Sequence, residues 1–141
     1  MQDLETAKQR LNQRGLTLSI VKNEKIIFES KTHGISDFLE AVERLKSKLE
    51  GSSIADRVVG KAVAFLCAYA NVQAVFAETL SRSAKASLEK YGIYHEWNNL
   101  VERILNAGKT ETCPFEKLAE NFSDPEEAYK KLKEKLKETS S

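Results

Sequence analysis

The stretch IADRVVGKAVAFLCAYA, residues Ile54–Ala70, decides the fold that the rest of the chain builds around. After Arg57, only Gly60 and Lys61 interrupt its apolar residues. Apolar side chains on all sides of a helix indicate a helix that is packed on both sides. We therefore predict one buried helix over residues 54–70. It is too short to cross a bilayer, which takes roughly 20 residues.

The bulk properties are those of a globular protein, and they exclude several functions. The chain has 141 residues, of which 22 are Lys or Arg and 21 are Asp or Glu, so its formal net charge is +1. This balance offers no basic surface for nucleic acid or for an anionic membrane. Polar residues follow Met1 where a signal peptide would be apolar, and two cysteines do not make a disulfide scaffold. We expect a cytoplasmic protein that contacts neither nucleic acid nor membrane.

An antiparallel hairpin is predicted near the beginning of the chain. Residues 16–22 (LTLSIVK) alternate between apolar and polar side chains with a period of two, which is typical of a half-buried strand. Asn23-Glu24 separates them from residues 25–30 (KIIFES), and asparagine tolerates the positive φ of a tight turn. A helix over residues 1–13 precedes the hairpin.

Helices and strands alternate after the hairpin, and this order predicts the fold class. Parallel strands joined by crossover helices need this spacing, so we predict a three-layer α/β/α sandwich. We assign residues 1–141 to one domain, with an N-terminal helix at 1–15, a core at 16–98 and C-terminal helices at 99–141. The predicted elements are a helix from Ser36 or Asp37 to Leu49, the helix over 54–70, strands over 72–78 and 93–97, a helix from Ser81 or Ser83 to Lys90, and short helices over 100–105, from Pro114 and from Pro125.

Three candidate site residues stand at the start of the apolar stretch. Asp56 is either the N-cap of the predicted helix or a ligand-facing side chain, because helix N-termini beside strand ends bind ligands in α/β sheets. Gly60 permits the close approach of a backbone or a ligand. Lys61 either extends its stem to solvent or pairs with an anionic group. Ala55 and Ala62 stand where a phosphate-binding loop needs Gly and Ser or Thr, so that loop is excluded.

Three further residues are candidates because of their position. Cys113 precedes Pro114 at a predicted helix start, where the helix dipole lowers the pKa of a thiol. It is either a nucleophile or a small residue beside a proline-initiated helix. Glu78 lies at a predicted strand end and Ser81 at the next helix start, both on the crevice side of a sheet. Cys67 is expected to be an inert core residue.

The sequence predicts neither a metal site nor a cofactor. His33 and His95 are far apart and have no partner at metal-ligand spacing. The chain also lacks a glycine-rich dinucleotide loop and the sequence patterns of serine hydrolases.

Several phrases resemble a prokaryotic family of domains of unknown function that is placed among the cytidine-deaminase-like folds. These phrases are LTLSIVKNEKIIFES, IADRVVGKAVAFL, VFAETLS with LEKYGI, ETCPFE and DPEEAYKKLKEKL. The resemblance covers nearly the whole chain from about Leu16 onward. It implies an α/β/α sandwich with a mixed sheet, but not an activity, because fold does not determine function.

The resemblance also identifies a departure from working deaminases. Those enzymes bind zinc through His-x-Glu or Cys-x-Glu at the start of one core helix and through Pro-Cys-x-x-Cys at the start of the next. The positions we match to these motifs read Ala55-Asp56-Arg57 and Leu80-Ser81-Arg82-Ser83. No ligand residue is present there, so the sequence argues against zinc-dependent deamination.

Two functions from different classes fit these observations. The first is a zinc-independent domain that binds, or acts on, a small ligand at the deaminase-equivalent pocket, for which the fold suggests a nucleotide-like molecule. Asp56, Lys61 and Cys113 would then be the catalytic candidates, and Gly60, Glu78 and Ser81 the ligand-binding ones. The alternative is a non-enzymatic interaction module that works as a homo-oligomer.

Overall fold

The stretch at residues 54–70 is a strand, a glycine and a helix, so the prediction of one helix was wrong. In the computed structural model, which describes residues 2–32, 35–105 and 110–140, strand β3 covers Ser53–Val59 and helix α3 covers Lys61–Tyr69. Asp56 therefore lies inside a strand and does not cap a helix. An apolar run that is buried on both sides has no distinguishing periodicity, although β-branched Ile54, Val58 and Val59 favour a strand.

The predicted hairpin is confirmed. Strand β1 covers Leu18–Lys22 and pairs antiparallel with β2, Lys25–Ser30. Asn23 and Glu24 have φ angles of 51° and 69°, as a tight hairpin turn requires. The pairing register shifts between Ile20 and Val21, so the hairpin contains a bulge.

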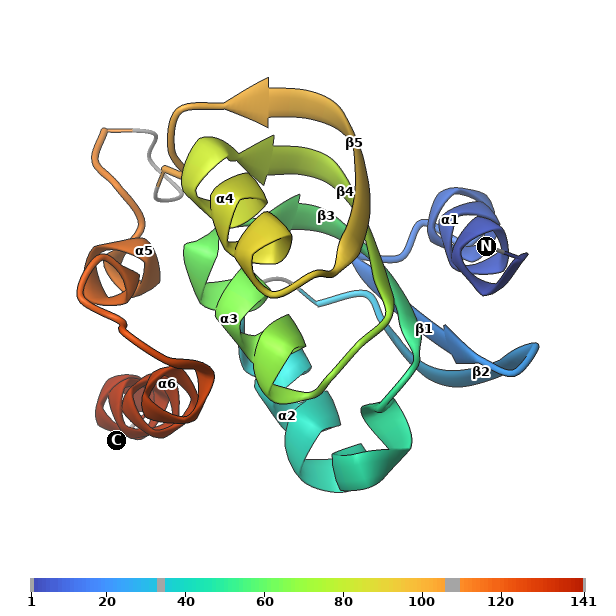
Figure 1. Cartoon of the computed structure of the whole chain (residues 1–141), viewed down its shortest axis with the longest axis horizontal. Helices are drawn as coiled ribbons and strands as arrows, with labels where there is room; N and C mark the ends of the chain where they lie inside the picture. Colours follow the sequence, from blue (N-terminus) through green and yellow to red (C-terminus); the bar gives the residue numbers. More distant parts are fainter. Residues whose placement is uncertain (1, 33–34, 106–109, 141) are drawn as a thin grey trace.

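The remaining strands are parallel to one another, which makes the sheet mixed. Its order is β2-β1-β3-β4-β5, with β4 at Ala74–Ser81 and β5 at Tyr94–Val101. Strand β3 pairs antiparallel with β1 and parallel with β4. Helix α3 and helix α4, Arg82–Lys90, are the two crossovers between the parallel strands. The sheet and its crossovers can be followed in Figure 1.

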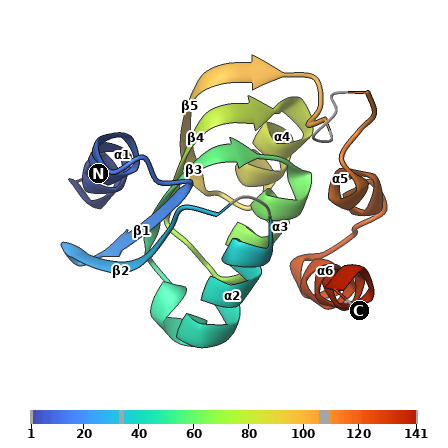
Figure 2. The same cartoon turned by 180° about the vertical axis from the view of Figure 1, so that it is seen from behind.

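One face of the sheet is covered by α1, Gln2–Gln13. Leu4, Ala7 and Leu11 lie on one side of this helix and are fully buried. They pack with Ala55 and Phe76 of the sheet in a small separate core. Figure 2 shows α1 alone on its side of the sheet, with the other helices opposite.

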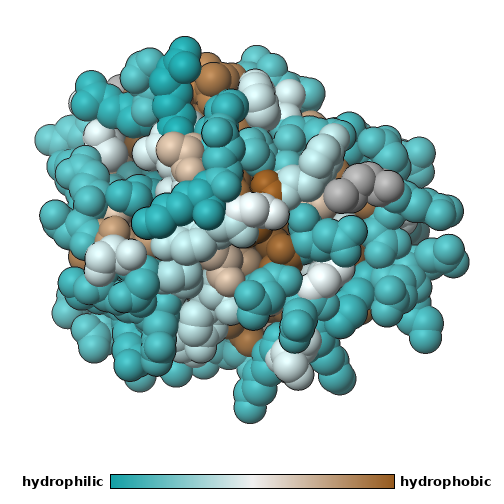
Figure 3. All heavy atoms as spheres, viewed as in Figure 1, coloured by the Kyte–Doolittle hydropathy of each residue, from teal (hydrophilic) through white to brown (hydrophobic). Residues whose placement is uncertain are grey.

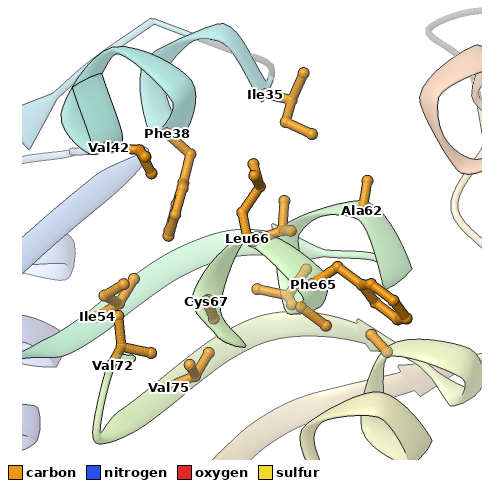
Figure 4. Packing of buried hydrophobic residues seen from close by; sticks show 14 of the residues in the cluster. Ile35, Phe38, Val42, Ile54, Ala62, Phe65, Leu66, Cys67, Val72 and Val75 are labelled. Carbon is orange, nitrogen blue, oxygen red and sulfur yellow. The ribbon is translucent and has the colours of Figure 1, made fainter. Parts of the chain in front are cut away.

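The larger core lies on the other face, around α3. Helix α2 (Ile35–Leu45), a 3-10 turn at Lys46–Leu49, α4, α5 (Pro114–Ala119) and α6 (Pro125–Ser140) surround it. Phe38 and Val42 point from α2 toward Leu66 of α3 and Ile54 of β3 (Figure 4). Cys67 is buried against the sheet in this core, as predicted. No helix within the described ranges is long and apolar enough to cross a membrane.

The C-terminal third differs from the prediction at one point. The predicted helix over 100–105 is wrong, because β5 runs to Val101 and Leu105 forms an isolated bridge with Thr112. The predicted boundary between residues 98 and 99 therefore falls inside β5. The helices at Pro114 and Pro125 are present, and Asp124 caps α6 by accepting the N–H of Glu127 at 2.8 Å.

Arg57 connects α1 to the sheet. Its guanidinium donates to the carbonyl oxygens of Leu11 at 2.8 Å and Leu16 at 2.9 Å, and to Glu78 Oε2 at 2.6 Å. Leu11 lies in the last turn of α1, where its carbonyl also accepts the N–H of Leu16 at 3.0 Å and the helix dipole favours a cation. One side chain therefore joins the end of α1 to a carboxylate on the neighbouring strand.

We predict that Arg57→Lys lowers the free energy of unfolding by about 1–3 kcal/mol, because one ammonium cannot replace three divergent donors. The measurement is urea denaturation. Arg82→Lys is the matched control, since Arg82 forms an exposed ion pair with Glu102, at 2.7 Å, and should change stability by less than about 0.5 kcal/mol. Equal losses in the two variants would contradict the role given to Arg57.

Candidate functional site

A cavity of about 530 Å³ lies between β1, α2, β3, the start of α3 and the segment before α5. We call it the Asp56 cavity. Its apolar walls come from α2, α3, residues 104–105 and residues 114–115, and its polar side chains are mainly acids, hydroxyls and one thiol. The lining residues are Thr17, Leu18, Thr32, Ile35, Asp37, Phe38, Asp56, Arg57, Val58, Gly60, Ala62, Val63, Ile104, Leu105, Cys113, Pro114, Phe115 and Glu116.

Asp56 is the polar group whose chemistry the cavity changes most. It lies on the α3 face of β3, while its neighbour Arg57 points to the α1 face, because successive strand residues alternate. Its carboxylate accepts the N–H of Val58 at 3.3 Å, and no hydrogen bond to it from a side chain is found among the described residues. Desolvation raises the pKa of Asp56 to about 7, well above its usual range.

Asp37 is the second carboxylate of the cavity, and it is held by hydroxyls. Ser30 Oγ donates to it at 2.6 Å, and Thr32 Oγ1 lies 2.5 and 2.6 Å from its two oxygens. The negative charge of Asp37 adds to the desolvation that raises the pKa of Asp56. Asp37 was predicted only as a helix start, and its place in the cavity was not predicted.

Glu116 of α5 occupies the N-terminus of α3. Its two carboxylate oxygens accept the N–H groups of Lys61 at 2.7 Å and Ala62 at 3.0 Å. These are donors that a helix start leaves without helical partners. Gly60 makes the contact possible, since a Cβ at that position would lie 2.2 Å from Glu116 Oε1. Desolvation raises the pKa of Glu116 above its usual range, against the lowering effect of the two N–H donors.

The structure brings together three of the six predicted site residues. Asp56, Gly60 and Cys113 all line the cavity although they come from β3, the β3–α3 junction and the start of α5. Cys113 is half-buried. Its backbone N–H donates to Ile104 O at 2.9 Å, and this hydrogen bond joins two segments that both line the cavity.

The other three candidates lie outside the cavity lining. The ammonium of Lys61 lies 5.6 Å from the ring centre of Phe65. Glu78 pairs with Arg57 on the α1 face. Ser81 is fully buried and caps α4, accepting the N–H of Ala84 at 3.1 Å, so its expected place at a helix start is confirmed. Glu116 was not among the predicted site residues. Gly60, before the start of α3, indicated that another group approaches the helix closely, and that group is the Glu116 carboxylate.

The residues at the helix starts do not fit a deaminase zinc site. Helix α3 begins after Gly60 and α4 after Ser81, and neither start carries Cys or His. Within residues 2–32, 35–105 and 110–140, no three His, Cys, Asp or Glu side chains are grouped so that they could hold a metal. His33 lies outside the described residues. His95 Nδ1 lies 2.8 Å from Ile93 O, within hydrogen-bond distance of this backbone carbonyl.

The sheet order, with crossover helices on one face and α1 on the other, defines an α/β sandwich with a mixed sheet, as predicted. A family model described as a domain of unknown function (DUF1893) matches residues 6–136, so the chain belongs to that family. The predicted resemblance is thereby confirmed.

The solved structures that are similar to this chain include a member of the same family. The DUF1893 family protein TM1506 from Thermotoga maritima is 29% identical, with a TM-score of 0.88 over 95% of this chain and 90% of that one. RibD from Acinetobacter baumannii has a TM-score of 0.50 at 17% identity, over 69% of this chain and 35% of that one. A dCMP deaminase from cyanophage S-TIM5 has a TM-score of 0.48 at 16% identity, over 68% and 94%. A search of curated proteins found no match.

The contact between Gly60 and Glu116 yields a prediction for a double-mutant cycle. Glu116→Ala removes the acceptor of two helix N–H groups and should cost about 1–2 kcal/mol of stability. Gly60→Ala should cost about 1–3 kcal/mol, because its Cβ displaces the same carboxylate. The double variant should be no less stable than Glu116→Ala, since the clash is gone and the φ of −101° at Gly60 suits alanine. Additive losses in urea denaturation would show that the two residues act separately.

Asp56 yields a prediction for the pH dependence of stability. Its raised pKa means that, between about pH 4 and pH 7, the folded chain binds more protons than the unfolded chain, so stability falls as pH rises through this window. Asp56→Asn removes this cost. Its stability relative to the parent should increase by on the order of 2 kcal/mol from pH 5 to pH 7.

The measurement is urea denaturation of both proteins at pH 5, 6, 7 and 8. Glu102→Gln, which removes an exposed carboxylate, controls for the change in net charge. A difference between Asp56→Asn and the parent that stays constant over this range would contradict the assignment.

Proposed function

We propose that this chain is a small-molecule-binding domain whose site is the Asp56 cavity. The observation that carries the proposal is the Asp56 carboxyl group, which has no side-chain donor among the described residues and lines a largely apolar cavity of about 530 Å³. Ligand sites in proteins are concave, mainly apolar, and have a few convergent polar groups. A titratable group with a pKa strongly shifted by desolvation is a further mark of such sites.

The distribution of exposed apolar residues supports the same site. The large hydrophobic residues that the structure describes as exposed include Val58 and Leu105, and both line the cavity. On the face shown in Figure 3, hydrophobic residues are visible only in small areas among hydrophilic ones. No particular observation favours the alternative of an oligomeric interaction module.

The charges around the cavity argue against a ligand that is bound through a phosphate group. Lys61, the residue expected to pair with an anion, does not line the cavity. The backbone N–H groups at the start of α3 already bind Glu116. The proposed ligand is therefore a small organic molecule recognised through its apolar body and through hydrogen-bond donors that reach Asp56.

A fragment screen by thermal unfolding tests the proposal. Cationic, neutral and anionic fragments are compared on the parent and on Val58→Trp, in which the larger side chain fills the cavity entrance. We expect fragments that raise the melting temperature of the parent and not of Val58→Trp, because binding to the folded state alone stabilises it.

Ile26→Trp is the matched control. Ile26 is 42% exposed and Val58 is 44% exposed, but Ile26 lies on the edge strand β2, outside the cavity lining. This variant should keep the parent's response to the fragments. A library that stabilises none of the proteins, or stabilises Val58→Trp as much as the parent, would overturn the proposal.

A further inference from the structure

The charged groups that line the Asp56 cavity are mostly acidic. Asp37, Asp56 and Glu116 bring three carboxyl groups to it. Arg57 is the one basic residue among the described lining residues, and its guanidinium is held on the opposite face of the sheet by Leu11, Leu16 and Glu78. A ligand in the cavity therefore meets the acids without meeting the Arg57 cation.

The three carboxyl groups differ in how well they are satisfied. Glu116 accepts two backbone N–H groups, and Asp37 accepts from two hydroxyls. Asp56 accepts backbone N–H groups of its own strand but no described side-chain donor. It is thus the carboxyl group of the cavity with capacity left for a ligand.

The helix start at the cavity is closed to anions. The N-terminus of a helix ordinarily attracts phosphate or carboxylate groups through its free N–H groups. Here the carboxylate of Glu116 takes the N–H groups of Lys61 and Ala62, and Gly60 leaves the room it needs. An incoming anion would have to displace this carboxylate and approach two further acids.

We propose that the ligand of this cavity is an organic cation, a protonated amine or amidine on an apolar body, whose N–H groups bind Asp56. The inference rests on the proposed function and specifies its ligand class. The apolar body packs against Ile35, Phe38, Val63 and Phe115, which line the same cavity. A bound cation also offsets the free-energy cost of desolvating the Asp56 carboxylate, because a buried charge is tolerated when it is paired and hydrogen-bonded.

The test is a set of three compounds with one shape and different charges. They are 1-naphthylmethylamine, 1-naphthalenemethanol and 1-naphthoate, titrated into the full chain at pH 7.5 by calorimetry. The amine should bind about tenfold more tightly than the alcohol, as a hydrogen bond to a charged group in place of a neutral one provides. The carboxylate should bind most weakly.

Asp56→Asn assigns the effect to its residue. In this variant, the affinity for the amine should fall about tenfold, to that of the alcohol, and the affinity for the alcohol should remain. Glu102→Gln, which removes an exposed carboxylate outside the cavity, should leave the parent's ranking unchanged. Thermal unfolding of each variant without ligand establishes that it is folded.

The outcomes separate the ligand class from the existence of the site. Equal affinity for amine and alcohol, preference for the carboxylate, or an amine affinity unaffected by Asp56→Asn each overturn the cation inference. An amine that does not bind at millimolar concentration overturns it as well. In all these cases the proposed function still stands if neutral or anionic fragments stabilise the parent and not Val58→Trp, and it fails only if no fragment does so.

Discussion

The two faces of β3 must both be covered, and the rest of the structure follows from how this is done. As the strand between β1 and β4, it cannot be exposed on either face without leaving Ile54 or Ala55 in water. Helix α1 covers the side of Ala55, and the right-handed crossover through α3 covers the side of Ile54. Because α3 is itself apolar on most sides, α2, α4, α5 and α6 must surround it in turn.

The cavity is a consequence of this arrangement at one end of β3. The strand ends at Val59, and Gly60 turns the chain directly into α3, so the first turn of that helix faces the segment that leads to α5. Glu116 pins that segment through two backbone N–H groups. The same contact closes the helix start to anions and holds the wall that carries Cys113 beside Asp56. The closed helix start and the position of the wall that carries Cys113 therefore depend on the same Glu116 carboxylate.

Local signals in the sequence were enough to predict the hairpin, the helix starts at Ser81 and Pro125, and the alternation that defines the fold class. Ile54–Ala70 was misassigned because a central strand and a buried helix are both apolar on all sides, and periodicity alone does not separate them. That error carried into the site. Because successive side chains of a strand point to opposite faces of the sheet, Arg57 lies on the face opposite Asp56. Glu78, which pairs with Arg57, lies on that face as well. The role of Glu116 could not be predicted, because it contacts Lys61, which is 55 residues away in the sequence. Gly60 was the local feature that indicated such a close contact.

Asp56 and Arg57 show how adjacent residues of a central strand serve different ends. Arg57 strengthens the fold, since its guanidinium joins the last turn of α1 and Leu16 to Glu78 of the sheet. Asp56 weakens it at neutral pH, since desolvation disfavours its charged form. A cation that pairs with Asp56 lowers its pKa and restores the stability that ionisation removes. Ligand affinity and fold stability are then linked through a single proton, and the carboxyl group that is unfavourable in the free chain provides binding energy in the complex.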